Sequence, residues 1–221
     1  MSSHILSLFM IISSYLIGSI PPAYLIAKFK FGINIKEQGS GNVGGANSAR
    51  LMGKNIGILV GVLDVLKGTL AVLLTKVVVS SQINGKIELF TSLEVVLAFS
   101  GIAAVLGHCF SIFLKFKAGK GMATTGGVVL ALDPISFLIL LGVMIVLVFV
   151  VTKITSLSNL IGVILVPILL YISLNVVAYL VMGIILVGII YYTHRENIRR
   201  LFAGNERKIG QKEEINRSKS I

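Results

Sequence analysis

The stretch ISFLILLGVMIVLVFVV, residues 135–151, contains no charged side chain. An apolar run of about this length can cross the hydrocarbon core of a bilayer as a helix. Other long runs that are largely apolar occupy residues 5–27, 51–79, 89–114 and 159–193. Because these runs recur along the whole chain, the sequence predicts an all-α integral membrane protein.

The composition supports the same fold class. The chain has 221 residues, of which 55% are hydrophobic and 13% are charged, whereas charged residues make up about a quarter of a soluble domain. No ten-residue alternating pattern of the kind found in membrane barrels is present. The single cysteine, Cys109, excludes an intramolecular disulfide and a zinc-type cysteine cluster. The N-terminus lacks the basic region of a secretory signal, so we expect the first span to be retained.

Turn signals divide the apolar runs into seven spans, some of them short. Pro21-Pro22 predicts a kink near the end of the first span, and Asn84-Gly85 predicts a turn before the third. Residues 122–132 are too few to cross unless the segment is tilted or packed inside the protein, and Asp133-Pro134 ends it. A small loop is expected at residues 153–158. Asn175 is expected to divide residues 159–193 into two short spans joined by a tight turn.

The distribution of basic residues predicts the orientation. With seven crossings and the C-terminus inside, 17 of the 20 Lys and Arg fall on the inner side. This is a strong positive-inside bias, so we expect an outer N-terminus and a cytoplasmic C-terminus. The inner residues are Lys28, Lys30, Lys36, Arg50, Lys54, Lys115, Lys117, Lys120, Lys153, Arg195, Arg199, Arg200, Arg207, Lys208, Lys212, Arg217 and Lys219.

Three polar segments meet on this inner side. The first, residues 39–50 (GSGNVGGANSAR), combines glycines that allow backbone N–H groups to approach an anion with Arg50, a forked cation suited to phosphate. The second includes Lys120, which lies between Gly119 and Gly121. The third begins at His194. Asn197 follows three residues later, so a continuing helix would place both side chains on one face. The alternatives are a flexible interhelical loop, a headgroup-binding basic loop and a helix anchor, respectively.

Two further polar features lie within the spans. Asp64 and Lys67 are three residues apart on one helix face, so they form either an internal salt bridge or a support for the anion site. His108 precedes the second polar segment and is either a proton carrier or a polar residue with a structural role. The pattern Gly39-x-Gly41-x-x-Gly44 lacks the strand of a dinucleotide-binding unit, and Gly119-Lys120 lacks the other residues of a P-loop.

These motifs resemble those of the bacterial PlsY family of acyl-phosphate:glycerol-3-phosphate acyltransferases. Residues 39–50 with Asp64 and Lys67 are similar to the first family motif, residues 107–124 to the second and residues 194–206 to the third. The resemblance covers nearly the whole chain. Gly45-Ala46 stand where the family usually has Ala-Thr, Ser111 replaces a usual proline and Ala118 a usual glycine.

The resemblance implies a seven-span enzyme of the bacterial cytoplasmic membrane with its active site on the cytoplasmic face. It would transfer an acyl chain from acyl phosphate to the 1-hydroxyl of glycerol 3-phosphate, giving lysophosphatidate and inorganic phosphate. No acyl-CoA, acyl carrier protein, metal or other cofactor would be needed. We expect one membrane acyltransferase domain, residues 1–198, and a polar cytoplasmic tail, residues 199–221. Membrane lipid is the expected surrounding, a monomer the expected state, and nucleic acid is not an expected partner.

The predicted site residues fall into three groups. The catalytic and glycerol-3-phosphate-binding group is Ser40, Arg50, Lys120, His194 and Asn197. The acyl-phosphate-binding group is Gly39, Gly41, Asn42, Gly44, Gly45 and Asn47. The supporting group is Asp64, Lys67, His108, Gly119, Gly121 and Glu206.

Three questions stay open at this point. The proton acceptor is His194, His108 or the substrate phosphate. Ser40 as an acylated nucleophile ranks behind direct transfer, because no adjacent base is evident in the sequence. A transporter for a phosphorylated solute is the rival function, and a non-catalytic scaffold leaves the three motifs unexplained.

Overall fold

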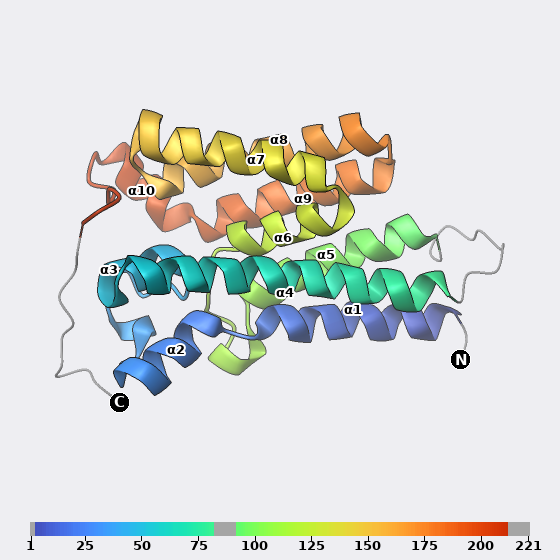
Figure 1. The fold of residues 1–221 in the computed structure, drawn as a ribbon, viewed down its shortest axis with the longest axis horizontal. Helices are drawn as coiled ribbons and strands as arrows, with labels where there is room; N and C mark the ends of the chain where they lie inside the picture. Colours follow the sequence, from blue (N-terminus) through green and yellow to red (C-terminus); the bar gives the residue numbers. More distant parts are fainter. Residues whose placement is uncertain (1–2, 82–91, 212–221) are drawn as a thin grey trace.

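The computed structural model describes residues 3–81 and 92–211, and these ranges are helical with short connections (Figure 1). The Asn84-Gly85 turn signal and the last ten residues of the predicted tail lie outside the described residues. The elements are α1 (Ser3–Ser19), α2 (Pro22–Phe31), the 3₁₀ turn Ile35–Glu37, α3 (Gly45–Met52), α4 (Lys54–Ser80), α5 (Leu93–Cys109), the 3₁₀ turn Ile112–Leu114, α6 (Met122–Leu132), α7 (Pro134–Val146), the π-helical turn Leu147–Thr152, α8 (Thr155–Leu174), α9 (Val177–Thr193) and α10 (Arg195–Phe202).

Within the described residues, five helical segments are long and apolar enough to cross a membrane. A sixth is added if α9 and α10, which are bent by 62° at His194, are taken together. The 11-residue α6 is apolar but shorter, about 16 Å at 1.5 Å per residue. The structure therefore gives five to six candidate spans, and the count of seven stays a prediction.

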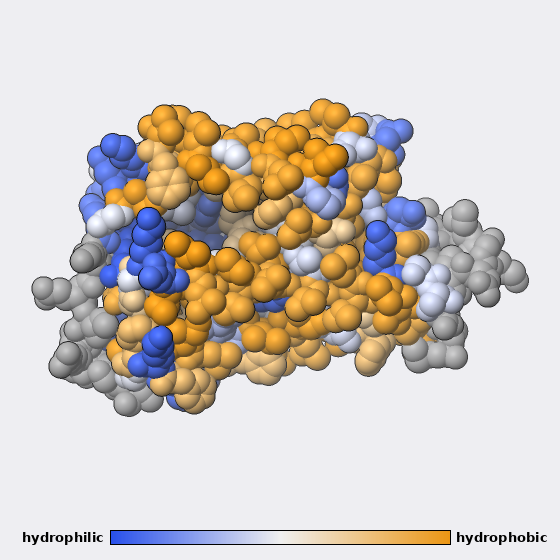
Figure 2. Space-filling model, viewed as in Figure 1, coloured by the Kyte–Doolittle hydropathy of each residue, from blue (hydrophilic) through white to orange (hydrophobic). Residues whose placement is uncertain are grey.

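The helices form two layers with α6 between them (Figure 1). One layer contains α1, α4 and α5, and the other contains α7, α8 and α9. The short helix α6 packs mainly on α4 and α7, while α5 also contacts α9. Figure 2 shows the resulting surface as an apolar band with hydrophilic residues gathered at its two ends. Such a band is the surface expected of a helical bundle surrounded by lipid.

Small residues allow α4 and α6 to approach closely. A Cβ atom added to Gly127 would lie 1.9 Å from the carbonyl oxygen of Val65, and one added to Gly68 would lie 2.3 Å from that of Thr124. Close backbone approach at glycine is a common basis of helix association in membranes. This close packing on α4 holds α6 in the bundle, although α6 is short.

Several predicted boundaries are confirmed. The first apolar run breaks at Ile20-Pro21, and Pro22 occupies the first turn of α2, where its missing N–H costs no hydrogen bond. The segment 122–132 forms one helix, as its turn signals predict. Asn175 has a left-handed backbone (φ 51°) between α8 and α9, and therefore forms the predicted tight turn.

Other boundaries differ from the prediction. The loop expected at 153–158 is shorter, because α8 begins at Thr155. The first polar segment is not a loop throughout, since α3 begins at Gly45 and includes Arg50. The polar end of the chain continues as the helix α10 as far as Phe202, and a turn at Ala203-Gly204 follows it directly.

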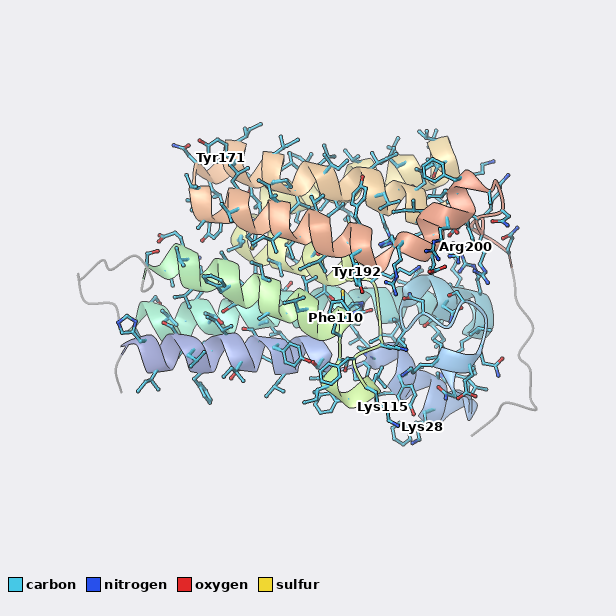
Figure 3. The ribbon with its side chains drawn as sticks, turned by 180° about the vertical axis from the view of Figure 1, so that it is seen from behind. Lys28, Phe110, Lys115, Tyr171, Tyr192 and Arg200 are labelled. Atoms are coloured by element: carbon cyan, nitrogen blue, oxygen red, sulfur yellow. The ribbon has the colours of Figure 1, made fainter. Side chains whose placement is uncertain are left out.

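The helix ends gather the polar segments at one end of the bundle. The short helices α2, α3 and α10 all lie there, opposite the start of α1 (Figure 1). In the rear view, Lys28, Lys115 and Arg200 lie at this same end and Tyr171 lies at the other (Figure 3). We call the end that carries α2, α3 and α10 the motif end.

Candidate active site

A cavity of about 700 Å³ lies at the motif end and extends along the bundle between α4, α6 and α7. All three sequence motifs line it. Figure 2 shows a hollow on this face, in which hydrophilic residues are visible inside the apolar band. The cavity therefore has a polar part and an apolar part, which are described in turn.

The first polar segment forms a tight turn followed by the start of α3. Gly39 and Gly41 have positive φ angles of 58° and 69°, which glycine adopts without steric cost. The Ser40 N–H donates to the Asn47 side-chain oxygen at 3.0 Å, and the Asn47 amide donates to the Gln38 carbonyl at 3.2 Å. Asn47, fully buried, thus fixes the turn against α3. This arrangement presents glycine backbone and a helix N-terminus to the cavity, which is a setting suited to an oxyanion.

Lys120 projects into the cavity from the turn between α5 and α6. Its Nζ donates to the Asn197 side-chain oxygen, and its carbonyl accepts the Thr193 hydroxyl at 3.0 Å. Burial, together with the positive charges of Arg200, Arg50 and Arg207, lowers the pKa of Lys120 to about 8, although Glu206 opposes this shift. A lysine with this pKa is mostly charged at neutral pH and is close to titrating.

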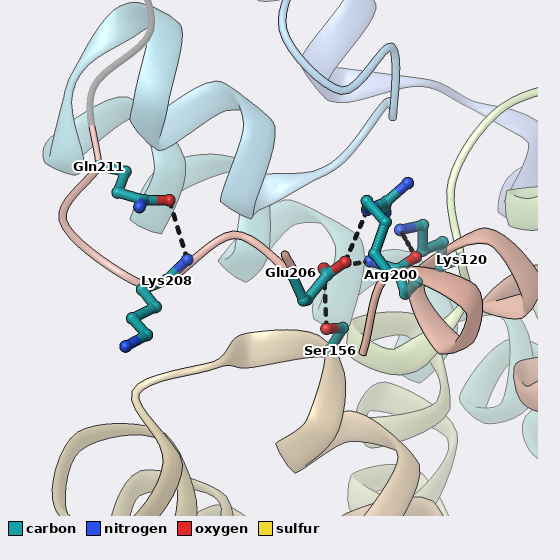
Figure 4. A network of polar contacts seen from close by, with 7 residues as sticks. Lys120, Ser156, Arg200, Glu206, Lys208 and Gln211 are labelled. Carbon is teal, nitrogen blue, oxygen red and sulfur yellow. Dashed lines mark hydrogen bonds and ion pairs between the residues drawn. The ribbon is translucent and has the colours of Figure 1, made fainter. Parts of the chain in front are cut away.

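Glu206 joins three segments of the motif end (Figure 4). Its carboxylate accepts from the Asn197 amide at 2.6 Å, the Ser156 hydroxyl at 2.9 Å and the Arg200 guanidinium at 2.7 Å. Although burial favours the neutral carboxyl, these hydrogen bonds hold the pKa of Glu206 below its ordinary value. The charged carboxylate therefore ties the chain after α10 to α8 and orients Asn197 toward Lys120.

His194 lies at the bend between α9 and α10 and is 1% exposed. Its Nδ1 lies 2.8 Å from the Ile190 carbonyl, which can only accept, so Nδ1 carries the proton. Its Nε2 lies 3.4 Å from the Asn159 amide nitrogen and is therefore an acceptor. Burial and the nearby Lys120 charge lower the pKa of His194 to about 4. His194 is thus neutral at physiological pH.

The predicted ion pair inside the bundle is present. Lys67 Nζ lies 2.9 Å from the Asp64 carboxylate and donates to the Ile20 carbonyl at 2.9 Å. His108 Nδ1 lies 3.3 Å from the same carboxylate oxygen. Asp64 and His108 line the cavity, whereas Lys67 does not.

The cavity brings together most of the predicted site residues. Gly39, Gly41, Lys67 and Gly119 do not line it, although the first two shape the glycine turn and the last two contact residues that do. The predicted residues that line it are Ser40, Asn42, Gly44, Gly45, Asn47, Arg50, Asp64, His108, Lys120, Gly121, His194, Asn197 and Glu206.

Five polar lining residues were not among the predicted site residues: Thr155, Ser156, Asn159, Arg200 and Arg207. Three of them belong to α8, whose first turn carries polar side chains at the start of an otherwise apolar helix. That contrast is a sequence signal for a helix end facing a polar site. The partners of Ser156 and Asn159 lie 50 and 35 residues away in the chain, so these two pairings have no local sequence signal.

The apolar part of the cavity lies between α4 and the α6–α7 pair. Ile58, Val62 and Leu66 follow one another along α4 at helical spacing and are 56%, 50% and 45% exposed. These side chains are exposed on the outside of the bundle and also line the cavity, so the apolar part of the cavity opens sideways along α4. The remaining apolar lining residues are Val65, Met122, Ala123, Leu130, Phe137, Leu140, Leu141 and Met144.

Comparison with known proteins places this chain in a family. The model of the family described as glycerol-3-phosphate acyltransferase matches residues 8–204. The chain is 40% identical over 204 residues to the glycerol-3-phosphate acyltransferase of Thermoanaerobacter sp. (strain X514), covering 92% of this chain and 96% of that one. It is 39% identical over 206 residues to the enzyme of Aquifex aeolicus (strain VF5), covering 91% and 98%.

Two solved structures share the fold. Both are crystal structures of PlsY, described as an integral membrane glycerol 3-phosphate acyltransferase, one in a glycerol 3-phosphate form and one in a lysophosphatidic acid form. The first superposes with a TM-score of 0.80 at 38% identity, covering 92% of this chain and 96% of that one. The second superposes with a TM-score of 0.78 at 38% identity, covering 93% and 96%. The all-helical, multi-pass membrane architecture is therefore confirmed.

The family model covers most of the chain, relatives at about 40% identity cover nearly all of it, and the superposed structures share its helices. The chain belongs to the PlsY family of integral membrane glycerol-3-phosphate acyltransferases.

Proposed function

We propose that the protein transfers an acyl chain from an acyl phosphate to the 1-hydroxyl of glycerol 3-phosphate, giving lysophosphatidate and inorganic phosphate. The observation that carries this proposal is the division of one cavity into a cationic polar part and an apolar part that opens sideways. The first suits two phosphate groups, and the second suits an acyl chain that stays in the membrane. Family membership supports the acceptor and the product, because the superposed enzymes are described in glycerol 3-phosphate and lysophosphatidic acid forms.

The acyl-phosphate group binds at the glycine turn in this proposal. The backbone of residues 39–45 and the first N–H groups of α3 approach the phosphate without side-chain interference. Glycine at position 45 also fits the packing of this chain, because a Cβ there would lie 2.8 Å from the Gly57 carbonyl on α4. This contact gives a packing reason for glycine at one of the four positions where the chain departs from the usual family pattern.

Glycerol 3-phosphate binds between Arg50, Lys120 and the α9–α10 bend. Arg50 and Lys120 neutralise phosphate charge, and Asn197 and His194 orient the glycerol hydroxyls. The acyl phosphate is already activated, so proximity and charge stabilisation supply much of the rate. The attacking oxygen forms a bond to the acyl carbon, the bond from that carbon to the phosphate oxygen breaks, and phosphate leaves.

The proton of the attacking hydroxyl goes to a substrate phosphate. A phosphate monoester has a second pKa of about 6, which makes it a stronger base than His194, whose pKa is lowered to about 4. Both nitrogens of His194 already face partners, so His194 is also poorly placed to activate Ser40. The Ser40 hydroxyl instead accepts from the Asn42 N–H at 3.4 Å. This geometry favours direct transfer over an acylated Ser40.

We further propose seven crossings, with the N-terminus outside and the motif end in the cytoplasm. The positive-inside bias supports this orientation. The seven crossings are the α1–α2 segment, α4, α5, the short α6, α7, α8 and α9. Glycerol 3-phosphate would then enter from the cytoplasm and the acyl donor from the surrounding leaflet.

The test uses purified protein in detergent or lipid with labelled glycerol 3-phosphate. The donor is palmitoyl phosphate, palmitoyl-CoA or palmitoyl carrier protein, each supplied alone. We expect labelled lysophosphatidate and released phosphate from palmitoyl phosphate only. Product from a thioester alone would overturn the donor, and no product from any donor with folded protein would move the assignment to a phosphorylated-solute transporter.

A further inference from the structure

Three ionisable side chains are buried together beside the polar part of the cavity, where the proposed transfer gives them no role. Asp64, Lys67 and His108 are 2%, 6% and 6% exposed. The same Asp64 carboxylate oxygen lies 2.9 Å from Lys67 Nζ and 3.3 Å from His108 Nδ1. Burying charged groups is costly unless they are paired, so this cluster requires an explanation.

The cluster has the outline of a general-base dyad, in which an aspartate holds Nδ1 of a histidine and Nε2 accepts a proton. The surroundings of His108 exclude that role. A Cβ atom added to Gly119 would lie 1.8 Å from His108 Nε2, so the glycine backbone covers this nitrogen. The His108 ring is therefore enclosed between the Asp64 carboxylate on one edge and the Gly119 backbone on the other.

The glycine that covers His108 Nε2 belongs to the turn that carries Lys120. The Gly119 N–H donates to the His108 carbonyl at 3.1 Å, so the turn and the end of α5 are in direct contact through backbone as well as ring. Gly121, with φ 93°, closes the turn before α6. A displacement of the His108 ring toward Gly119 would push the turn, and with it the Lys120 ammonium group.

We propose that Asp64 and His108 are positioning residues that fix the Gly119–Lys120–Gly121 turn and thereby set the affinity for glycerol 3-phosphate. Asp64 orients the His108 ring, and the ring supports the turn. Lys67 balances the Asp64 charge and anchors it to the α1–α2 break through the Ile20 carbonyl. This inference rests on the proposed function, because it takes Lys120 as a phosphate ligand.

Two double variants separate positioning from simple charge pairing. Asp64→Asn with Lys67→Met removes both charges but keeps a side-chain oxygen facing His108 Nδ1. Asp64→Leu with Lys67→Met also removes both charges but takes away the oxygen that lies beside His108 Nδ1. Neither leaves a lone buried charge, which would itself destabilise the protein. The comparison therefore isolates the contact between residue 64 and the His108 ring.

The measurements are KM and kcat for glycerol 3-phosphate at saturating palmitoyl phosphate, direct binding of glycerol 3-phosphate by calorimetry, and thermal unfolding. We expect Asp64→Leu/Lys67→Met to raise both KM and the dissociation constant for glycerol 3-phosphate about tenfold, because a misplaced cation loses its phosphate contact. The Asn-containing variant should recover most of this loss. Adding His108→Phe to Asp64→Leu/Lys67→Met should change KM no further, because both act through one contact.

The control is Thr75→Val on the same helix, about 16 Å farther along α4. It removes buried hydrogen bonds of Thr75 with Ala71 and Ser100, so it should lower the unfolding temperature and leave the glycerol 3-phosphate affinity unchanged. Equal affinities in the two Asp64 double variants would overturn the inference. Absence of product from the wild-type protein would instead contradict the proposed function, and the calorimetric comparison would still decide the role of the cluster.

Discussion

At the residue scale, Arg50 shows what a forked cation supplies. It lies on α3 after the glycine turn and lines the polar part of the cavity. Replacing it with lysine keeps the charge but loses the planar pair of donors that matches a phosphate. We expect Arg50→Lys to lower kcat/KM about a hundredfold, the magnitude typical of losing a placed donor at a reacting centre.

The matched control for Arg50→Lys is Arg199→Lys. Arg199 carries the same guanidinium, but it is 77% exposed and pairs with Glu196 on the surface of α10. It should retain normal turnover in the same acyl-transfer assay. If folded, membrane-inserted Arg50→Lys protein turned over at a near-normal rate, the assignment of Arg50 would be wrong.

Lys120 predicts how the activity depends on pH. Its pKa of about 8 means that the ammonium charge is present below that pH and is lost above it. Because the phosphate of glycerol 3-phosphate is already doubly charged there, kcat/KM should fall as the pH rises through about 8. Lys120→Arg should shift this decline to higher pH, since a guanidinium stays charged. If the wild type and Lys120→Arg lose activity at the same alkaline pH, the decline is caused by another group.

Most of the polar residues that line the cavity could be picked out from the sequence because they stand in compact motifs. Glycine, serine and arginine within residues 39–50 contrast with the apolar runs on either side, and this contrast marks the segment as a candidate anion site. Asn159 and Ser156 were missed for a physical reason. Their partners, His194 and Glu206, are brought close only by the packing of α8 on α9 and by the fold of the chain after α10.

At the scale of elements, turn chemistry was the reliable guide. Pro21-Pro22, Asp133-Pro134 and Asn175 each mark a real break, because proline and left-handed asparagine act through the local backbone. The start of α3 at Gly45 and of α8 at Thr155 was not predictable in the same way. Glycine and β-branched residues have low helix propensity, and packing against α4 and α7 stabilises these helix ends instead.

Helix α6 forms one wall of the apolar part of the cavity, which we call the apolar groove. Gly126 on this wall has no side chain and leaves the groove open. A Cβ at this position would lie 3.6 Å from the Phe137 ring on α7, an ordinary contact, so a larger side chain would extend into the groove. We expect Gly126→Leu to raise the activity ratio of short-chain to palmitoyl donors about tenfold. The measurement is kcat/KM over a series of acyl phosphates of increasing length.

The matched control for Gly126→Leu is Gly142→Leu on α7. Gly142 is exposed, has no atom near its missing Cβ and does not line the cavity. It adds the same leucine on the lipid-facing side, so the chain-length preference should stay as in the wild type. A preference unchanged by Gly126→Leu would show that the acyl chain lies elsewhere.

At the scale of the whole molecule, the charge distribution predicts its direction in the membrane. Ser81 ends α4 away from the motif end, and Lys208 lies beyond α10 at the motif end; both are exposed. Cys109 is buried, so background labelling should be low. With a membrane-impermeant maleimide, Ser81→Cys should react in intact cells, and Lys208→Cys only after the cells are permeabilised. The reverse pattern would place the motif end outside.

The sideways opening of the cavity has a consequence for how the enzyme meets its two substrates. Ile58, Val62 and Leu66 leave the apolar groove continuous with the surrounding leaflet. An acyl donor that enters there is dissolved in the membrane. The rate therefore depends on the mole fraction of donor among the lipids, and hardly on its bulk concentration. Glycerol 3-phosphate, in contrast, follows its bulk concentration. Adding inert phospholipid at a constant amount of donor should therefore slow the reaction by surface dilution, just as removing part of the donor would.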